Sequence, residues 1–154
     1  MAVLLTWSGF ALHPTIHEDQ ALVRWRVKRA KSQPFTLEAP HRKLVMETIR
    51  TYCGKRDWLI LALHIRPTHI HLVLDTHADP ARAVGAVKSA CTAALRAARL
   101  AGPNDRIWAD YRNIRNLKTP LSIAAAVYYV LNQQGSPMEV YPQPAEPLVG
   151  DSEP

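Results

Sequence analysis

Two histidines separated by a single residue, His69 and His71, have the spacing of a metal-binding pair. They lie in the segment PTHIHLVLD, which predicts a β-strand over residues 69–75. Residues i and i+2 of a strand point to the same side, so we expect the two imidazoles side by side. Such a pair can hold one divalent metal ion from a rigid platform. The alternative is structural: two half-buried histidines, each with a hydrogen-bond partner.

The ligand types narrow the choice of metal. Zinc normally takes three or four protein ligands, which this pair does not supply alone. A histidine pair with one oxygen ligand, leaving positions for phosphate oxygens and water, is better suited to Mg²⁺ or Mn²⁺. The expected cofactor is therefore Mg²⁺ or Mn²⁺.

A tyrosine and a glutamine near the end of the last predicted helix form the second candidate group. Tyr129 and Gln133 are four residues apart, so they share one face of a helix. A tyrosine hydroxyl is a weak nucleophile until a metal or a base assists it, and an amide oxygen is a reasonable ligand for a hard metal. Tyr128, about 100° around the helix, stays open as an alternative nucleophile. The neighbouring amides of Asn132 and Gln134 stay open as alternative ligands, and ordinary packing could also explain the tyrosines.

Hydrophobic periodicity and turn residues predict the elements that must position these groups. Strands are predicted over residues 2–7, 22–28, 58–65, 69–75 and, less clearly patterned, 107–115; helices are predicted over 40–55, 80–100 and 120–135. The break between the strands 58–65 and 69–75 is so short that they should form an antiparallel hairpin. Mainly antiparallel strands with helices to cover them predict an α+β sandwich.

The composition indicates one globular domain. The chain has 154 residues, of which 47% are hydrophobic and 21% charged, and this excludes a long disordered protein. The sequence has no run of 18 apolar residues, so no membrane span is expected. The N-terminus also lacks the pattern of a secretory signal. The two cysteines, Cys53 and Cys91, are expected to be free thiols in a reducing cytoplasm.

Charge divides the chain into two parts. Residues 1–135 carry all 19 basic residues and only nine acidic ones, so this part is a candidate for a polyanion partner. Residues 136–154 contain five prolines, four acidic residues and no Lys or Arg. We therefore predict a domain over 1–135 and an extended or disordered tail over 136–154. A basic protein without such a partner is the alternative that charge alone leaves open.

Several segments together resemble the single-tyrosine HUH transposases. PTHIHLVL is similar to their His–hydrophobic–His signature, and YVLNQ resembles their tyrosine helix. Between these two, AVGAVKSACTAALR and RIWADYR are similar to a lysine-containing helix and a tryptophan-containing segment of the family. The resemblance covers about residues 2–135 and extends to insertion-sequence transposase-like proteins and REP-associated tyrosine transposases. Arg66 departs from it, since many members have an aliphatic residue or Met there.

The resemblance implies a fold and a reaction. The fold would be the HUH-endonuclease (ferredoxin-like) sandwich, with His-x-His on a central strand. The protein would be a metal-dependent single-stranded DNA endonuclease and strand transferase acting near DNA hairpins in the bacterial cytoplasm. His69, His71 and Gln133 would bind Mg²⁺ or Mn²⁺, and Tyr129 would form a 5′-phosphotyrosine intermediate. The implied partners are hairpin-containing single-stranded DNA and, in members that act as homodimers, a second copy of the chain.

Basic residues outside the two motifs are candidate DNA contacts, because backbone phosphates bind cations. These candidates are Arg24, Arg26, Lys28, Lys88, Arg112 and Arg115. The alternative for each is a solvated surface cation. Two other function classes remain: a domesticated nucleic-acid-binding module without turnover, and a small histidine metalloenzyme with a non-nucleic substrate, which the cationic surface disfavours.

Overall fold

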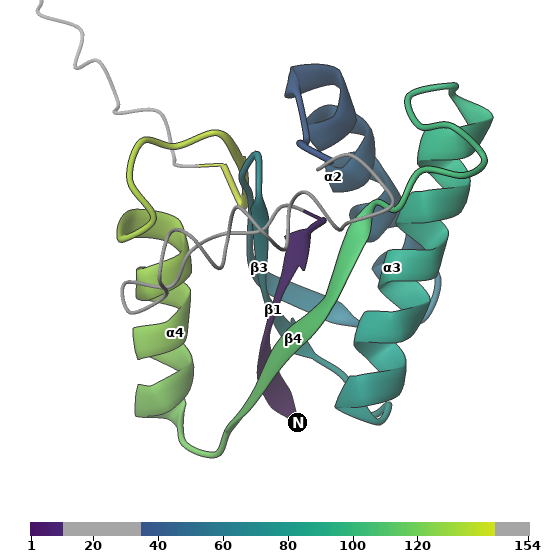
Figure 1. The fold of residues 1–154 in the computed structure, drawn as a ribbon. Helices are drawn as coiled ribbons and strands as arrows, with labels where there is room; N and C mark the ends of the chain where they lie inside the picture. The colour runs from purple at the N-terminus through teal and green to yellow at the C-terminus, as the bar shows by residue number, and fades with distance from the viewer. Residues whose placement is uncertain (11–34, 144–154) are drawn as a thin grey trace, which may run out of the picture.

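The computed structural model describes residues 1–10 and 35–143, which form one antiparallel sheet with helices on both faces (Figure 1). The strands are β1 Ala2–Gly9, β2 Leu59–Ile65, β3 His69–Asp75, β4 Trp108–Leu117 and β5 Glu139–Tyr141. The helices are α2 Ala39–Gly54, α3 Pro80–Ala97 and α4 Pro120–Asn132. The strand order is β4-β1-β3-β2-β5, so the strand with the histidine pair is the central one. The predicted α+β class is confirmed.

The period-two pattern of the central strand divides its side chains between two cores. Ile70, Leu72 and Leu74 pack with residues of α2 and α3. Val73 packs on the opposite face with Ala126 of α4 and its neighbours. Figure 1 shows the same division, with α4 on one side of the sheet and α2 and α3 on the other. His69 and His71 have the parity of Val73 and therefore lie on the α4 face.

The predicted hairpin of β2 and β3 is confirmed, and its register brings a third histidine into the row. The two strands pair antiparallel, with His64 of β2 directly opposite His71 of β3. On the other side of β3, Thr6 of β1 is also opposite His71. The two antiparallel pairings therefore put three polar side chains in one row on the α4 face.

Capping residues explain where α3 and α4 begin. Asp79 accepts a hydrogen bond from the backbone N–H of Arg82 at the start of α3, with Pro80 in the first turn. Thr119 and Ser122 form a reciprocal capping box at the start of α4. Both starts were predicted by the sequence. The end of α4 is earlier than predicted, at Asn132, because the chain must turn there to reach β5.

The predicted boundary of the tail is wrong. Glu139–Tyr141 is the strand β5, which pairs antiparallel with β2, and its Val140 is only 6% exposed. One buried aliphatic residue and a short ladder are enough to add this segment to the sheet, although its prolines argue against a helix. The predicted strand 22–28 and residues 144–154 lie outside the described part of the chain.

Two further features concern the cysteines and the helices. Cys53 and Cys91 are buried and free, and burial raises their pKa values to about 11 and about 12, respectively. Both thiols are therefore protonated at neutral pH. Within residues 1–10 and 35–143, no helix has the length and hydropathy that crossing a bilayer requires.

Candidate active site

The histidine pair lies on the α4 side of the central strand, as the strand pattern predicts. The rings of His69 and His71 are nearly parallel, with an interplanar angle of 11° and centroids 6.3 Å apart. His71 is only 8% exposed, whereas His69 is half-buried. The strand therefore presents two imidazoles together, one of them in a largely dry environment.

Threonine hydroxyls orient both imidazoles. Thr6 Oγ1 lies 3.2 Å from Nδ1 of His71, and Thr68 Oγ1 lies 2.8 Å from Nδ1 of His69. A ring whose Nδ1–H donates to such a hydroxyl carries its lone pair on Nε2, the tautomer that metal ligation through Nε2 requires. Thr6 and Thr68 thus fix the orientation of the two imidazole rings.

Burial keeps the His71 ring neutral. Desolvation, together with the nearby charges of His69, His64 and Arg66, lowers its pKa from 6.5 to about 4. Because only a neutral imidazole can ligate a metal, His71 has the ligating form throughout the neutral pH range.

The metal-free protein should lose stability as the pH falls from about 6.5 to about 4. In this interval the unfolded chain protonates His71 and the folded chain does not, so proton uptake favours unfolding. The free energy of unfolding should fall by at most about 3 kcal/mol. Urea unfolding at a series of pH values, in the presence of a chelator, measures this slope. The variant His71→Gln should flatten it, and an equally steep profile in that variant would contradict the assignment.

Tyr129 of α4 faces the buried histidine across a cavity. Its ring meets that of His71 edge to face, with centroids 6.2 Å apart and an interplanar angle of 88°. Tyr129 is 42% exposed, so its hydroxyl can be reached by a large ligand. The cavity has a volume of about 420 Å³. Its lining residues are Leu4, Thr6, His71, Asn113, Arg115, Ser122, Ala125, Ala126 and Tyr129. The neighbouring Tyr128 is 59% exposed and is not among them.

The three amides after Tyr129 differ in their surroundings. Asn132 donates from Nδ2 to the Tyr128 carbonyl, 3.2 Å away, which turns its amide onto the helix. Gln133 is exposed and forms the C-cap, where its backbone N–H donates to the Tyr129 carbonyl. Gln134 is half-buried, and its Nε2 has no hydrogen-bond partner in the described part of the chain. Of the three, Asn132 is the least suited to reach the histidine pair.

The residues of this site fit a divalent metal held by two nitrogens and oxygens. Two imidazoles can share one ion only when their ring centroids are within roughly 6.5 Å, the upper limit set by two metal–nitrogen bonds of about 2.1 Å in a straight line. The measured separation of His69 and His71 meets this condition. Within residues 1–10 and 35–143, no group of three or more His, Cys, Asp or Glu side chains could hold a metal. Among the described residues, a third ligand would therefore be an amide or a hydroxyl, which suits Mg²⁺ or Mn²⁺ better than zinc.

The described cations that the sequence predicts to contact DNA lie on both faces of the sheet. Arg115 has the strand parity of the α4 face and lines the cavity with Tyr129. Lys88 and Arg112 instead line a hollow between α3 and β4, on the opposite side of the sheet. Lys88 and Arg112 therefore do not line the cavity of Tyr129 and His71, and their contact with DNA stays a prediction. Arg24, Arg26 and Lys28 lie outside the described residues.

Three polar residues of this region were not singled out as site residues. Thr6 interrupts the apolar run AVLLTW, and this is the signal that could have identified it. Asn113 lines the cavity from β4, opposite Thr6 in the sheet register. His64 of β2 is the cross-strand neighbour of His71. Only strand pairing brings these residues to the site.

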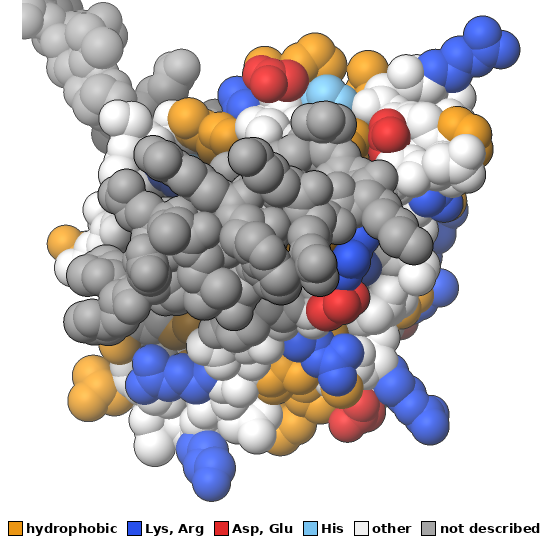
Figure 2. All heavy atoms as spheres, viewed as in Figure 1, with side chains coloured by type: hydrophobic (Ala, Val, Ile, Leu, Met, Phe, Trp, Pro, Cys, Tyr) orange, Lys and Arg blue, Asp and Glu red, His pale blue; other side chains and the backbone are white. Residues whose placement is uncertain are grey.

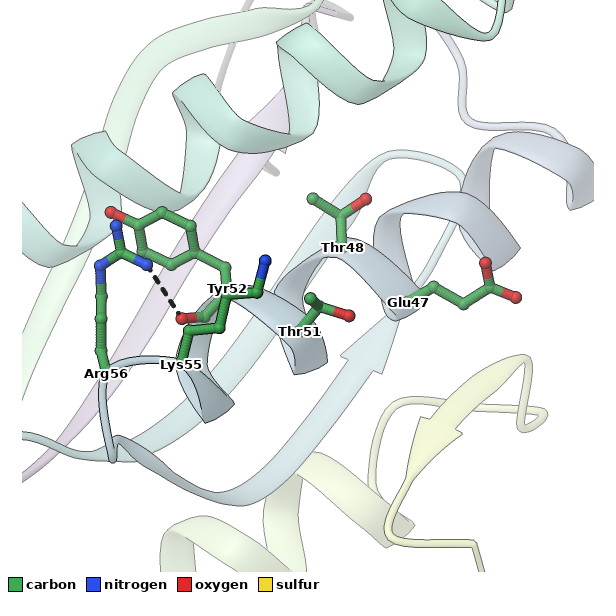
Figure 3. A pocket seen from close by; sticks show the side chains of 6 residues that line it. All are labelled: Glu47, Thr48, Thr51, Tyr52, Lys55 and Arg56. Atoms are coloured by element: carbon green, nitrogen blue, oxygen red, sulfur yellow. Dashed lines mark hydrogen bonds between the residues drawn. The ribbon is translucent and has the colours of Figure 1, made fainter.

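A larger hollow on α2 does not contain the side chains of an active site. It is lined by Glu47, Thr48, Thr51, Tyr52, Lys55 and Arg56. Figure 3 shows that these side chains project from α2 and its C-terminal end, with the Arg56 guanidinium against the Tyr52 ring. The arginine also donates to the Tyr52 carbonyl. A stacked, hydrogen-bonded pair of this kind stabilises the helix end.

One solved transposase structure shares this fold. A REP-associated tyrosine transposase bound to a REP hairpin matches with a TM-score of 0.51 at 12% sequence identity. The match covers 84% of this chain, and the chain spans only 64% of that protein's length. A candidate transposase from Deinococcus radiodurans R1 is 17% identical, with a TM-score of 0.47, and the match covers 86% of this chain and 90% of that one. No curated protein compared with the chain is similar enough to count as a match.

The family model for IS200-like transposases matches residues 23–132. This range contains the histidine pair, Tyr129, and all of the elements between β2 and α4. The match covers more than half of the chain, and the first solved structure has the same fold. The chain therefore belongs to the IS200-like transposase family.

Proposed function

We propose that the protein cleaves single-stranded DNA next to a hairpin and transfers the cleaved strand, with Tyr129 as nucleophile. The observation that carries this proposal is the edge-to-face meeting of Tyr129 and His71 in one cavity. Membership of the IS200-like transposase family and the fold shared with a REP-associated tyrosine transposase bound to a REP hairpin support it.

The proposed reaction is a phosphoryl transfer in two steps. The Tyr129 oxygen attacks a backbone phosphorus, the bond to the 3′ oxygen breaks, and a 5′-phosphotyrosine forms. The phenolic proton goes to solvent, and the departing 3′ oxygen takes one up as a 3′-OH. In the second step a 3′-OH of another strand attacks the phosphotyrosine and releases Tyr129. The phosphodiester energy is kept in the link, so no nucleotide cofactor is required.

His69, His71 and Gln133 are the residues that we propose to hold Mg²⁺ or Mn²⁺. The ion would supply Lewis-acid stabilisation of charge on the phosphate oxygens. Thr6 and Thr68 keep the two rings in a ligating orientation, and burial keeps His71 neutral. Arg115, at the cavity rim, would bind a flanking phosphate.

Lys88 and Arg112 would contact DNA from the other side of the sheet, away from the reacting phosphate. The hollow that they line also contains Arg96 and Trp108. Burial lowers the pKa of Lys88, and the nearby Arg112 and Arg106 lower it further, as expected where cations gather. Lys and Arg side chains are also spread over the face shown in Figure 2, around the undescribed residues.

Removing a cation from either face should weaken DNA binding in a salt-dependent way. Arg115→Gln and Arg112→Gln should each reduce affinity severalfold and lower the slope of log K against log salt by about 0.7–0.9, the contribution of one phosphate contact. Fluorescence anisotropy with a labelled hairpin oligonucleotide at four salt concentrations measures both quantities. Arg56→Gln, on the α2 surface, is the matched control and should leave the slope unchanged. An unchanged slope for Arg115→Gln would remove that residue from the proposed DNA path.

The direct test is a screen for a covalent protein–DNA adduct. Single strands carrying the hairpins that flank the gene are incubated with the full chain and Mn²⁺, then separated on a denaturing gel. The proposal expects a protein band shifted by the mass of the 5′-linked fragment, together with a free 3′-OH fragment. The alternative, a domesticated binding module, expects salt-sensitive binding of the same strands with no cleavage of any of them.

A further inference from the structure

The connector that joins α4 to β5, residues 133–138, is held by two side chains from the end of β2. His64 Nε2 accepts a hydrogen bond from the backbone N–H of Met138, at 3.3 Å. Arg66 Nη1 donates to the Ser136 carbonyl, at 3.1 Å. Neither residue belongs to the proposed catalytic set, yet both act on the chain directly after Tyr129 and Gln133.

His64 also lies under the last turn of α4. It is 1% exposed, and its Nδ1 is buried without a hydrogen-bond partner in the described part of the chain. Burial and Arg66 lower the pKa of His64, while the Val130 carbonyl acts in the opposite direction, which puts that carbonyl near the ring. Val130 directly follows Tyr129. Its carbonyl is one of the last four of the helix, which have no partner within the helix.

The tautomer follows from the Met138 contact. Because Nε2 of His64 accepts that hydrogen bond, the proton of the neutral ring resides on Nδ1. This N–H has no hydrogen-bond partner in the described part of the chain, although the Val130 carbonyl lies near the ring. One buried imidazole thus joins β2 to the end of the connector and lies close to the end of α4.

Arg66 packs against the turn of the connector at Gly135. Gly135 has φ +77°, a conformation that side chains rarely adopt. A Cβ at this position would lie 3.5 Å from a guanidinium nitrogen of Arg66. The glycine therefore lets the backbone turn close beside the arginine, and the arginine's hydrogen bond to Ser136 retains that turn.

The strand β2, which carries His64 and ends directly before Arg66, also pairs with β5, the strand that follows the connector. β5 pairs with β2 in a register that puts Val140 opposite His64 and Glu139 opposite Ile65. At its other end, α4 follows β4, which pairs with β1. Both ends of the tyrosine helix are therefore fastened to the sheet that carries His71, within one chain.

We propose that His64 and Arg66 are positioning residues that hold the last turn of α4 so that Tyr129 faces His71 of the same chain. They touch neither the DNA nor the metal in this account. Their effect is on the alignment of the nucleophile and not on DNA affinity. The inference rests on the proposed function for its catalytic readout, and on the described contacts alone for its structural one.

Arg66→Ala is the primary variant and Arg66→Lys its conservative partner. We expect Arg66→Ala to lower the single-turnover rate of adduct formation about tenfold to 100-fold at saturating DNA, the scale of an approximately 1 Å misplacement. The DNA concentration for half-maximal rate should change less than about threefold, since no DNA contact is lost. Arg66→Lys, which retains one donor, should recover most of the rate. Lys118→Ala, an exposed cation before α4, is the matched control.

Amide hydrogen exchange supplies a readout that does not depend on activity. In Arg66→Ala and His64→Phe, peptides covering residues 129–138 should exchange faster, while those from β1 and β3 keep their protection. Unchanged exchange in both variants would overturn the proposal, as would a loss confined to DNA affinity. If the wild type forms no adduct with any strand, the proposed function fails, and exchange still decides whether these residues hold the helix end. If His64→Phe does not fold, Arg66→Ala carries the test.

Discussion

Tyr129→Phe should abolish the covalent protein–DNA adduct, lowering its rate of formation by at least about 10³-fold, because a phenyl ring has no oxygen to attack phosphorus. Tyr129 is the tyrosine of α4 that lines the cavity with His71. Its partial exposure means that removing the hydroxyl should change the free energy of unfolding by no more than about 0.5 kcal/mol. Denaturing gels after incubation with hairpin DNA and Mn²⁺ measure the adduct, and thermal unfolding measures the stability.

The adjacent tyrosine is the matched control for this variant. Tyr128 is more exposed than Tyr129 and lies outside the cavity lining, so Tyr128→Phe should form the adduct at a rate within about twofold of wild type. If Tyr128→Phe loses the adduct and Tyr129→Phe retains it, the nucleophile is assigned to the wrong residue. If both variants form it, Tyr129 is not the required nucleophile.

The second large effect is expected from the buried histidine. His71→Ala should weaken Mn²⁺ binding by at least about 100-fold. Mutating only the hydrogen-bond partner of a metal ligand already lowers metal affinity about 10- to 100-fold, and this variant removes the ligand itself. The adduct should disappear at Mn²⁺ concentrations that saturate the wild type. Adding a chelator to the wild type should have the same effect on the adduct. Isothermal titration with Mn²⁺ measures the affinity, and adduct formation over a range of Mn²⁺ concentrations measures its consequence.

His77→Ala tests whether this effect is specific. His77 is exposed in the turn between β3 and α3, so its loss should leave Mn²⁺ binding and adduct formation unchanged. Full Mn²⁺ affinity in a folded His71→Ala variant would contradict the proposed ligand set. Adduct formation that survives the chelator would contradict metal dependence altogether.

Local pattern predicted the parts of the site that depend on one element. The period of a strand put His69 and His71 on one side of β3, and the short break before them predicted the hairpin. The predicted start of the last helix at residue 120 is the observed start of α4. These features follow from the sequence because each is decided within a few residues.

The remaining features depend on contacts between distant segments. Lys88 and Arg112 look like site residues in the sequence, but α3 packs on the opposite face from α4, so they lie behind the sheet. The partnership of Thr6 with His71 requires the pairing of β1 with β3, across 65 residues of sequence. The strand β5 is too short to have a period of its own, so only its pairing with β2 defines it.

The most direct measurement of the central claim is the position of the DNA link in the wild-type adduct. The adduct is digested with nuclease and protease, and tandem mass spectrometry locates the residual nucleotide on the chain. A 5′-phosphate bonded to the Tyr129 oxygen is the result that we predict. A nucleotide on any other residue, or one joined through its 3′ phosphate, would contradict the proposal that this tyrosine attacks beside His71.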